Sequence, residues 1–163
     1  MRTGVDGVNL IKEFESLHDG DLSQIGLQPK MCPAKIWTEG YGRAMRNSNG
    51  VFLKGLKDKQ QAYNSITINT KKEAEIALIE DLKVFERVVS SKIKVELTQN
   101  QFDSLVSYTY NTGGSDTLFK LINKKSPDDQ IRRWFETKYI TANGVKLSGL
   151  VRRRKSEADL FFK

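Results

Sequence analysis

The chain has very little cysteine and proline, and it lacks long hydrophobic runs. Cys32 is the one cysteine among 163 residues, so no internal disulfide is possible and a reducing compartment is the simple interpretation. No stretch approaches the roughly 20 apolar residues of a membrane-spanning helix. The N-terminus has no apolar run behind a basic start, so we expect no signal peptide. Without repeats, linkers or low-complexity segments, the sequence favours one domain that buries its core without covalent cross-links.

Positive charge is in excess. Lysine and arginine number 27 against 20 aspartates and glutamates, which gives a formal net charge of +7. This charge favours a polyanionic partner such as nucleic acid, anionic lipid or an acidic cell envelope, although solubility alone explains it equally well. A nucleic-acid binder would also need aromatic side chains among basic residues on one exposed face. Here the aromatic residues follow the apolar stripes of expected helices, so we expect no nucleic-acid partner.

The first part of the chain predicts one helix followed by a small sheet. Leu10, Ile11 and Phe14 give a short helix one apolar face, which Thr3 or Asp6 would cap. Residues 20–58 are rich in glycine and hold two of the three prolines. This composition indicates a twisted antiparallel sheet with loops, and its β-prone pieces are residues 24–27, 35–38 and 51–53.

The remainder of the chain predicts helices. Thr70 and Glu73 form a capping box before an apolar stripe that runs to about Ile93, which makes this the longest helix. Thr98 and Gln101 form a second box, whose helix Gly113 stops. Strands segregate from helices, which is the α+β class. The shorter features expected are helices from Asp116, from the cap Ser126-Pro127 and from the cap Ser148, and a hairpin turn at Asn143-Gly144.

A candidate site lies between residues 14 and 42. Phe14-Glu15-Ser16 ends the first helix, and Thr38-Glu39-Gly40-Tyr41-Gly42 reads as a strand that bends tightly. Cys32 precedes Thr38 with five residues, 33–37, between them. The arrangement resembles the active-site segment of the phage-type lysozymes, which are muramidases. Their pattern is Phe-Glu-Gly, then an aspartate or cysteine, five more residues, and Thr-Ile-Gly-Tyr-Gly.

Three further stretches carry the resemblance through most of the chain in the right order. They are residues 68–82, 97–113 and 149–157, which match the family's connecting helix, its LTQNQFD segment and its GLxxRRxxE signature. The resemblance implies a lysozyme-like α+β fold in a single domain. We expect a sheet lobe at about residues 17–60 and a helical lobe at about residues 66–163. The N-terminal helix would pack on the helical lobe, and the long helix would join the two lobes.

Glu15 is the candidate general acid. Hydrolysis of a glycoside usually takes an acid that protonates the leaving oxygen and a second group that works at the anomeric carbon. The C-terminal end of a helix disfavours a carboxylate, and Phe14, Ile36 and Trp37 can lower the local polarity, so both features help Glu15 to keep its proton. The ordinary alternative is an exposed glutamate at a helix end.

The second group is less well defined. The resemblance assigns to Cys32 and Thr38 the placing and activation of the attacking water, but a thiol accepts hydrogen bonds weakly unless it is ionised. About twice as many residues separate Glu15 from Cys32 as in the family, so Asp21, or Asp19, could be the working carboxylate instead. Thr38 should point away from Glu39, because side chains alternate along a strand. If Thr38 faces the cleft, Glu39 faces out.

The chain departs from the family at three more positions. Ser16 replaces the glycine after the catalytic glutamate, Glu39 replaces an apolar residue, and Arg43 replaces a histidine. The resemblance also makes Tyr110 and Asn111 cleft-lining, substrate-binding residues. Their alternative roles are core packing for Tyr110 and a helix C-cap for Asn111.

The function that the resemblance implies is that of an endolysin. It would cut the β-1,4 bond between N-acetylmuramic acid and N-acetylglucosamine in peptidoglycan. We expect a monomer with no metal and no cofactor, held in the host cytoplasm until a holin releases it to the cell wall. The alternatives are a lytic transglycosylase and a non-catalytic peptidoglycan-binding relative. The basic run Arg152-Arg153-Arg154-Lys155 suggests either contact with an anionic outer-membrane surface or a structural arginine network.

Overall fold

The computed structural model describes residues 1–20, 23–142 and 144–163. Helices dominate, and the described strands are two or three residues long, so the predicted α+β class is confirmed. The chain forms two compact units. We call Glu15–Asp81 the sheet unit, and Met1–Phe14 together with Leu82–Lys163 the helical unit. The boundaries fall at the end of α1 (Val5–Glu15) and inside α3 (Lys71–Lys92), so both helices pass from one unit into the other.

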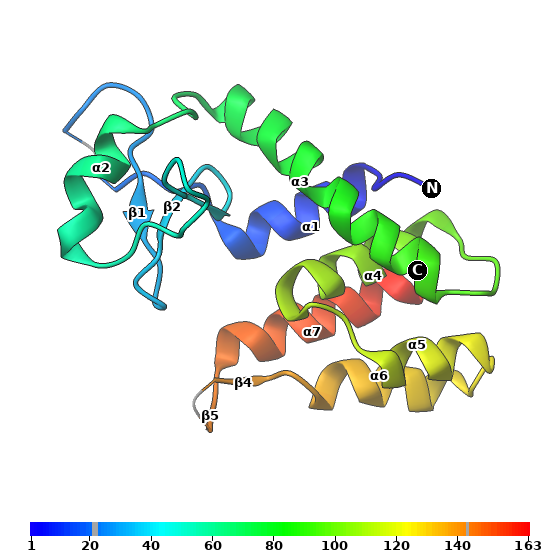
Figure 1. Cartoon of the computed structure of the whole chain (residues 1–163). Coiled ribbons are helices and arrows are strands. Elements are labelled where there is room, and N and C mark those ends of the chain that lie inside the picture. The colour runs from blue at the N-terminus through cyan, green and yellow to red at the C-terminus, as the bar shows by residue number, and fades with distance from the viewer. Residues whose placement is uncertain (21–22, 143) are drawn as a thin grey trace. The chain divides into compact units, whose positions relative to one another are not determined.

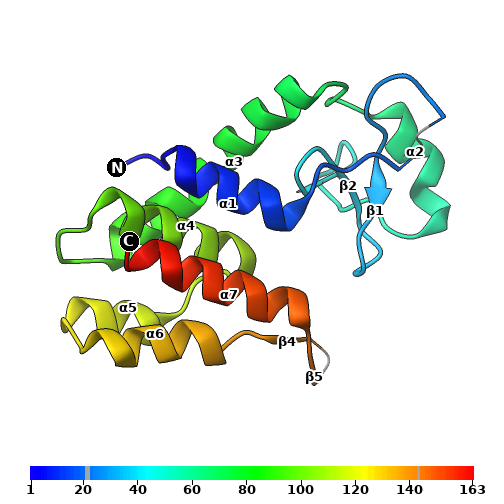
Figure 2. The ribbon, with the colours of Figure 1, turned by 180° about the vertical axis from the view of Figure 1, so that it is seen from behind.

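The helical unit packs its helices around an apolar core. α4 (Gln99–Thr112) lies against α7 (Ser148–Phe161), which also contacts α6 (Asp128–Thr137). α5 (Asp116–Asn123) lies beside α6, as both ribbon views show (Figures 1 and 2). None of the described helices has the length and apolar character needed to cross a membrane. The core that joins α4, α5, α6 and α7 is built from fully or almost fully buried side chains: Phe102, Leu105, Val106, Tyr108, Leu118, Phe135 and Phe161.

The start of α1 is held by a carboxylate from another helix. Asp103 on α4 accepts hydrogen bonds from the backbone N–H groups of Gly4, at 2.8 Å, and Gly7, at 3.1 Å. The expected local caps, Thr3 and Asp6, are therefore not what satisfies these donors. A Cβ atom on Gly7 would lie 2.7 Å from the Asp103 Cβ, so only glycine allows this close approach.

The helix ends follow the sequence signals in most places. Thr98 and Gln101 form the predicted capping box, and Gly113 ends α4 in the left-handed conformation. Thr70 and Glu73 form the other box, with hydrogen bonds of 3.0 and 3.2 Å. The two expected serine caps are wrong by one residue, because α6 begins after Pro127 and α7 after Leu147, and neither residue makes a side-chain cap. The predicted hairpin is confirmed as β4 (Thr141–Ala142) paired with β5 (Val145–Lys146), although Asn143 lies outside the described residues.

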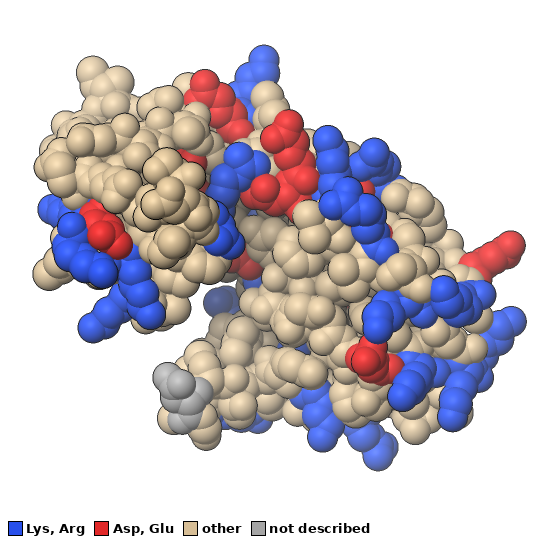
Figure 3. Space-filling view, viewed as in Figure 1, with Lys and Arg blue, Asp and Glu red and all other residues tan. Residues whose placement is uncertain are grey.

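Two of the four consecutive basic residues on α7 are buried. Arg153 and Arg154 are 3% and 0% exposed, and both contact the fully buried Glu157. Ser107 on α4 donates a further hydrogen bond to the Glu157 carboxylate, so this network joins α7 to α4. Arg152 and Lys155 remain exposed. Blue Lys and Arg side chains also gather over the α5 and α6 region of the face in Figure 3. Contact with an anionic membrane stays a prediction.

The sheet unit has little regular structure. β1 (Lys30–Met31), β2 (Trp37–Glu39) and β3 (Arg43–Ala44) form an antiparallel sheet in that order. A short 3-10 helix, η1 (Leu56–Asp58), leads into α2 (Lys59–Asn64). The expected strand at residues 24–27 is wrong, and that at 51–53 is reduced to one bridge between Phe52 and Arg46.

A small core lies on one side of this sheet. It consists of Trp37, Met45, Leu53 and Ala62, all 5% exposed or less. The Trp37 indole donates a hydrogen bond of 2.8 Å to the Gly55 carbonyl, which fixes the loop before η1. This cluster is one part of the apolar packing of the unit, which also buries Tyr41, Ile68, Ala74, Ala77 and Leu78.

Polar side chains supply the remaining connections. Glu39 accepts hydrogen bonds from the backbone N–H groups of Thr67, at 2.9 Å, and Ile68, at 3.1 Å. The expectation that Glu39 faces out into solvent is therefore wrong, since it is only 5% exposed. Arg43 makes two 2.9 Å hydrogen bonds to the Asp81 carboxylate, and this contact raises the pKa of Arg43. Glu39 and Arg43, which both differ from the family pattern, thus connect β2 and the turn after it to α3 and the segment before it.

Candidate active site

One open pocket of the sheet unit contains all three residues expected to be catalytic. The pocket has a volume of about 750 Å³, and its lining includes Glu15, Cys32 and Thr38. His18 and Lys30 border it as well. Residues that are distant in sequence therefore meet at one cavity, formed by the end of α1, the hairpin of β1 and β2, and the start of β3.

Glu15 is the last residue of α1 and is half-buried. The next residue, Ser16, has a φ of +57°, which is the left-handed conformation that commonly ends a helix. Glycine adopts this conformation without steric cost, whereas another L-residue loses roughly 1 kcal/mol. The glycine of the family motif is therefore explained by backbone geometry, and Ser16 keeps the same turn at a modest cost.

Thr38 is fixed by two hydrogen bonds at the edge of the pocket. Its hydroxyl donates to the backbone carbonyl of Lys30 at 2.8 Å, and the His18 Nδ1 atom lies 2.6 Å from the same oxygen. The side chain is 5% exposed. Trp37, on the opposite face of β2, belongs to the small core, so the predicted alternation along this strand is confirmed.

Cys32 lies in a tight loop between β1 and β2. Its N–H donates to the Ile36 carbonyl at 2.8 Å, and its own carbonyl accepts from the Lys35 N–H at 2.8 Å. The thiol is free of any disulfide and partly buried. This loop brings the thiol to the same pocket as Glu15 despite the long segment between them.

His18 is a pocket residue that the sequence analysis did not identify. Its backbone N–H donates to the Gly40 carbonyl at 2.8 Å, so the chain leaving α1 is attached to the turn after β2. Burial lowers the pKa of His18, and the nearby charge of Lys30 lowers it further, against the opposing effects of Glu15 and of a hydrogen bond with the Thr38 backbone. The available signal was its position as the one histidine of the chain, three residues after the candidate acid.

Of the two aspartates proposed as alternatives to Cys32, the structure describes only Asp19. The Asp19 carboxylate accepts a hydrogen bond from the Gln28 N–H at 3.3 Å, within the loop that follows α1. Asp21 lies outside the described residues. The identity of the second catalytic group therefore stays a prediction.

Tyr110 and Asn111 lie near the end of α4, in the helical unit. The Tyr110 ring packs edge-on against Phe85, with ring centroids 5.0 Å apart. The Asn111 side-chain oxygen accepts a hydrogen bond of 2.9 Å from Arg154, and the C-cap of the helix is Gly113 rather than Asn111. These contacts fix both side chains, and their role in binding substrate stays a prediction.

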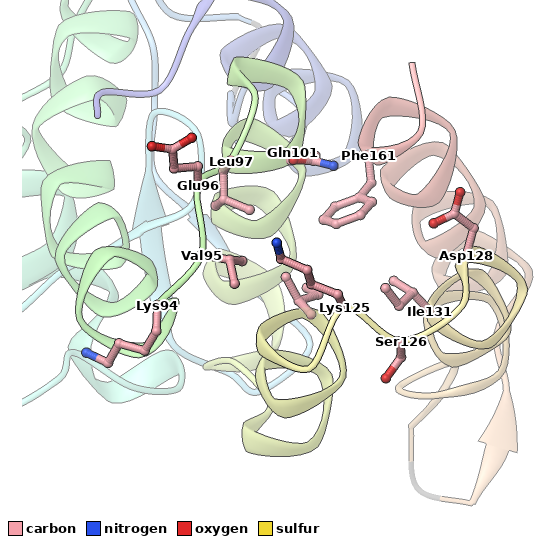
Figure 4. Close-up of a pocket in the computed structure, with 11 residues that line it drawn as sticks. Lys94, Val95, Glu96, Leu97, Gln101, Lys125, Ser126, Asp128, Ile131 and Phe161 are labelled. Carbon is pink, nitrogen blue, oxygen red and sulfur yellow. The ribbon is translucent and has the colours of Figure 1, made fainter.

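The helical unit has a pocket of its own, which has two carboxylates on its lining. It has a volume of about 660 Å³, and its lining combines apolar residues such as Phe161 with charged residues such as Lys94 and Lys125. Glu96 and Asp128 lie at opposite sides of it, as Figure 4 shows, and both residues are exposed. Across the described part of the chain, no cluster of three or more His, Cys, Asp or Glu residues is arranged to hold a metal ion.

The fold and the pocket define a lysozyme-like class of protein. The chain is similar to the endolysin from Escherichia coli O157:H7 phage FAHEc1, with 29% identity, a TM-score of 0.73 and coverage of 100% and 94% of the two chains. It is also similar to the muramidase domain of SpmX from Asticcacaulis excentricus, with 26% identity, a TM-score of 0.72 and coverage of 99% and 98%.

Sequence comparison gives the family. The phage lysozyme family model matches residues 22–157. An endolysin of Acyrthosiphon pisum secondary endosymbiont phage 1 is 29% identical over 99% of this chain and 98% of its own length. An endolysin of Bacillus phage PZA is 31% identical over 99% of this chain, which spans 55% of that relative. The chain belongs to the phage lysozyme family, a family of peptidoglycan-degrading enzymes.

Proposed function

We propose that this chain hydrolyses the β-1,4 bond between N-acetylmuramic acid and N-acetylglucosamine in bacterial peptidoglycan. The observation that carries the proposal is the common pocket of Glu15, Cys32 and Thr38. A helix-end carboxyl group and a pair of hydroxyl and thiol groups at one cavity supply an acid and a site for water, which are the two requirements of glycoside hydrolysis.

Glu15 is the general acid of the proposed reaction. It gives its proton to the glycosidic oxygen as the bond from that oxygen to the anomeric carbon breaks. A water molecule then adds to the anomeric carbon and releases one proton to the solvent, and the Glu15 carboxylate takes up one proton from the solvent, which restores the acid. Thr38 and Cys32 hold this water, and the net reaction consumes one water for each bond cut.

The biological setting follows from the same proposal. Cutting this bond breaks the glycan strands of the host wall, so the protein would lyse its host after a holin releases it. A relative described as a SAR-endolysin, from Escherichia phage P1, is 26% identical over 98% of this chain. Lysis of host cells that express this chain with and without a holin distinguishes the holin route from an independent route of export.

Mass spectrometry of digested peptidoglycan tests the chemistry. We expect the wild-type chain to release muropeptides that end in a reducing sugar. Glu15→Gln should lose at least about 100-fold in rate, since an amide cannot donate the proton. Glu13→Gln is the matched control, because Glu13 lies on the same helix and is exposed. Products that end in 1,6-anhydro sugars, one water lighter, would instead identify a lytic transglycosylase. Wall binding without any products would support the non-catalytic alternative.

A further inference from the structure

We propose that His18 is a positioning residue of this site. Its Nδ1–H group occupies one lone pair of the Thr38 hydroxyl, whose proton the Lys30 carbonyl holds, so that a single lone pair remains to accept a hydrogen bond from the attacking water. The role in the reaction rests on the proposed function. The hydrogen-bond arrangement itself does not, and it can be measured without substrate.

The first step is a count of protons around the Thr38 hydroxyl. A threonine hydroxyl has one proton to donate and two lone pairs that accept. The Lys30 carbonyl, 2.8 Å away, can only accept, so the hydroxyl proton lies on that contact. The His18 Nδ1 atom, 2.6 Å from the same oxygen, must then be the donor. The geometry therefore assigns the proton of neutral His18 to Nδ1 and leaves Nε2 as an acceptor.

The second step is what this arrangement does to Thr38. Its proton is used by Lys30 and one of its lone pairs by His18, so one lone pair remains. Thr38 can therefore accept a hydrogen bond from a water molecule but cannot donate one. A water bound in this way points a proton at Thr38 and turns a lone pair elsewhere, as a nucleophile must. Without His18, the Lys30 carbonyl would still hold the hydroxyl proton, but both lone pairs of the Thr38 oxygen would be open, so the position from which the water is bound would no longer be fixed.

The third step concerns how firmly His18 itself is held. Its backbone N–H is bonded to the Gly40 carbonyl at 2.8 Å, and its ring is bonded to Thr38, so β2 and the turn after it hold the residue at two points. Glu15 at the end of α1, Lys30 on β1 and the Cys32 thiol border the same pocket. Burial and Lys30 lower the pKa of His18, which favours the neutral ring. A protonated ring would oppose the positive charge that develops on the sugar.

Nitrogen NMR of the imidazole is the direct test. The chain has one histidine, so a ¹⁵N-histidine sample gives one unambiguous pair of ring signals. Above pH 7.5 we expect the wild-type spectrum to show the Nδ1–H tautomer. Thr38→Val should shift the population toward Nε2–H, because the side-chain acceptor for Nδ1–H has gone and only the hydrogen bond with the backbone of residue 38 remains. A wild-type spectrum dominated by Nε2–H would overturn the proposal, whatever the activity of the enzyme.

Two amide substitutions test the role in the reaction. An asparagine amide can place its N–H₂ near the position of Nδ1, whereas a glutamine amide reaches the position of Nε2. We expect His18→Asn to stay within a few-fold of wild type. His18→Gln should lose about 10- to 100-fold in kcat at an unchanged KM, since a misplaced group near the reacting atoms has costs of this size. In a Thr38→Val background, His18→Gln should cost nothing further.

Several results would contradict the role in catalysis. His18→Gln with wild-type kcat would overturn it, and so would an equal loss in His18→Asn and His18→Gln when both variants melt like wild type. A wild-type chain that releases no muropeptides would overturn the proposed function instead, and the tautomer measurement would still decide the hydrogen-bond arrangement.

Discussion

The two units of this chain are stabilised in different ways. The helical unit buries whole apolar faces of α4, α5, α6 and α7 against one another, and most of its fully buried side chains are hydrophobic. The sheet unit has strands of two or three residues, and three of the nine buried hydrophobic side chains among its described residues are alanines; the nine are Trp37, Tyr41, Met45, Leu53, Ala62, Ile68, Ala74, Ala77 and Leu78. Single polar side chains, such as Glu39 and Arg43, connect its segments. The pocket with the candidate catalytic residues thus lies in the sheet unit, in which a single polar side chain such as Glu39 can hold a backbone segment in position.

The largest expected effect is a loss of stability in the helical unit. The core of this unit is mainly apolar, but it also contains one buried charge network, that of Arg153, Arg154 and Glu157. Glu157→Gln would leave Arg153 and Arg154 buried without a counter-ion, and losing one partner of such a pair costs about 3–5 kcal/mol. The loss of unfolding free energy can be measured by urea unfolding, with ¹⁹F NMR of 5-fluorotryptophan as the probe. Trp134 reports on the helical unit and Trp37 on the sheet unit. The Trp134 signal should respond first.

The matched control for Glu157 lies in the same unit. Glu136 also pairs with an arginine, Arg132, at 3.3 Å, but its side chain is 39% exposed. Exposed pairs contribute about 0–1 kcal/mol, so Glu136→Gln should leave both unfolding curves almost unchanged. Similar losses in the two variants would show that burial is not what makes the Glu157 network important.

An intermediate effect is expected at Glu39 in the sheet unit. Glu39→Ala removes the acceptor for the Thr67 and Ile68 N–H groups, and we expect a loss of about 2–3 kcal/mol. Hydrogen exchange should speed up for residues 65–70 and for the unit as a whole, while α4 to α7 remain protected. Glu39→Gln keeps an oxygen acceptor and should lose less. Equal exchange in both units of Glu39→Ala would mean that they unfold as one.

The smallest expected effect is the same in both units. Thr98→Ala and Thr70→Ala each remove one capping-box hydroxyl, at the start of α4 and of α3, and each should cost about 1 kcal/mol. The Trp134 signal should report the first loss and the Trp37 signal the second. A much larger effect of Thr70→Ala would show that the sheet unit amplifies a local change, which would sharpen the contrast between the units.

The features that could be predicted from the sequence are those whose causes are local. The helices with strong local signals, such as the capping boxes at Thr70 and Thr98 and the glycine at 113, were correctly predicted because their causes lie within a few residues. The presence of Glu15, Cys32 and Thr38 at one pocket followed from the family motif. Their catalytic roles remain proposals.

The errors arose where a residue depends on a distant partner. Glu39 looked like an outward-facing strand residue because its partner, Thr67, lies 28 positions away. Thr3 and Asp6 looked like caps because nothing local reveals that Asp103 takes that place. His18 had no motif of its own, and only its hydrogen bond to Thr38 makes it part of the site.

The docking of α1 has a consequence for the order in which the protein is made. Its first turn is capped by Asp103, 99 residues beyond Gly4, and Arg153 lies over the ring of Phe14. The ribosome makes α1 first, but its docking partners on α4 and α7 emerge much later. The helix that ends in Glu15 therefore waits undocked until α4 and α7 have been made. Chains that end before α7 should be inactive, which for a wall-degrading enzyme ties activity to the synthesis of this helix.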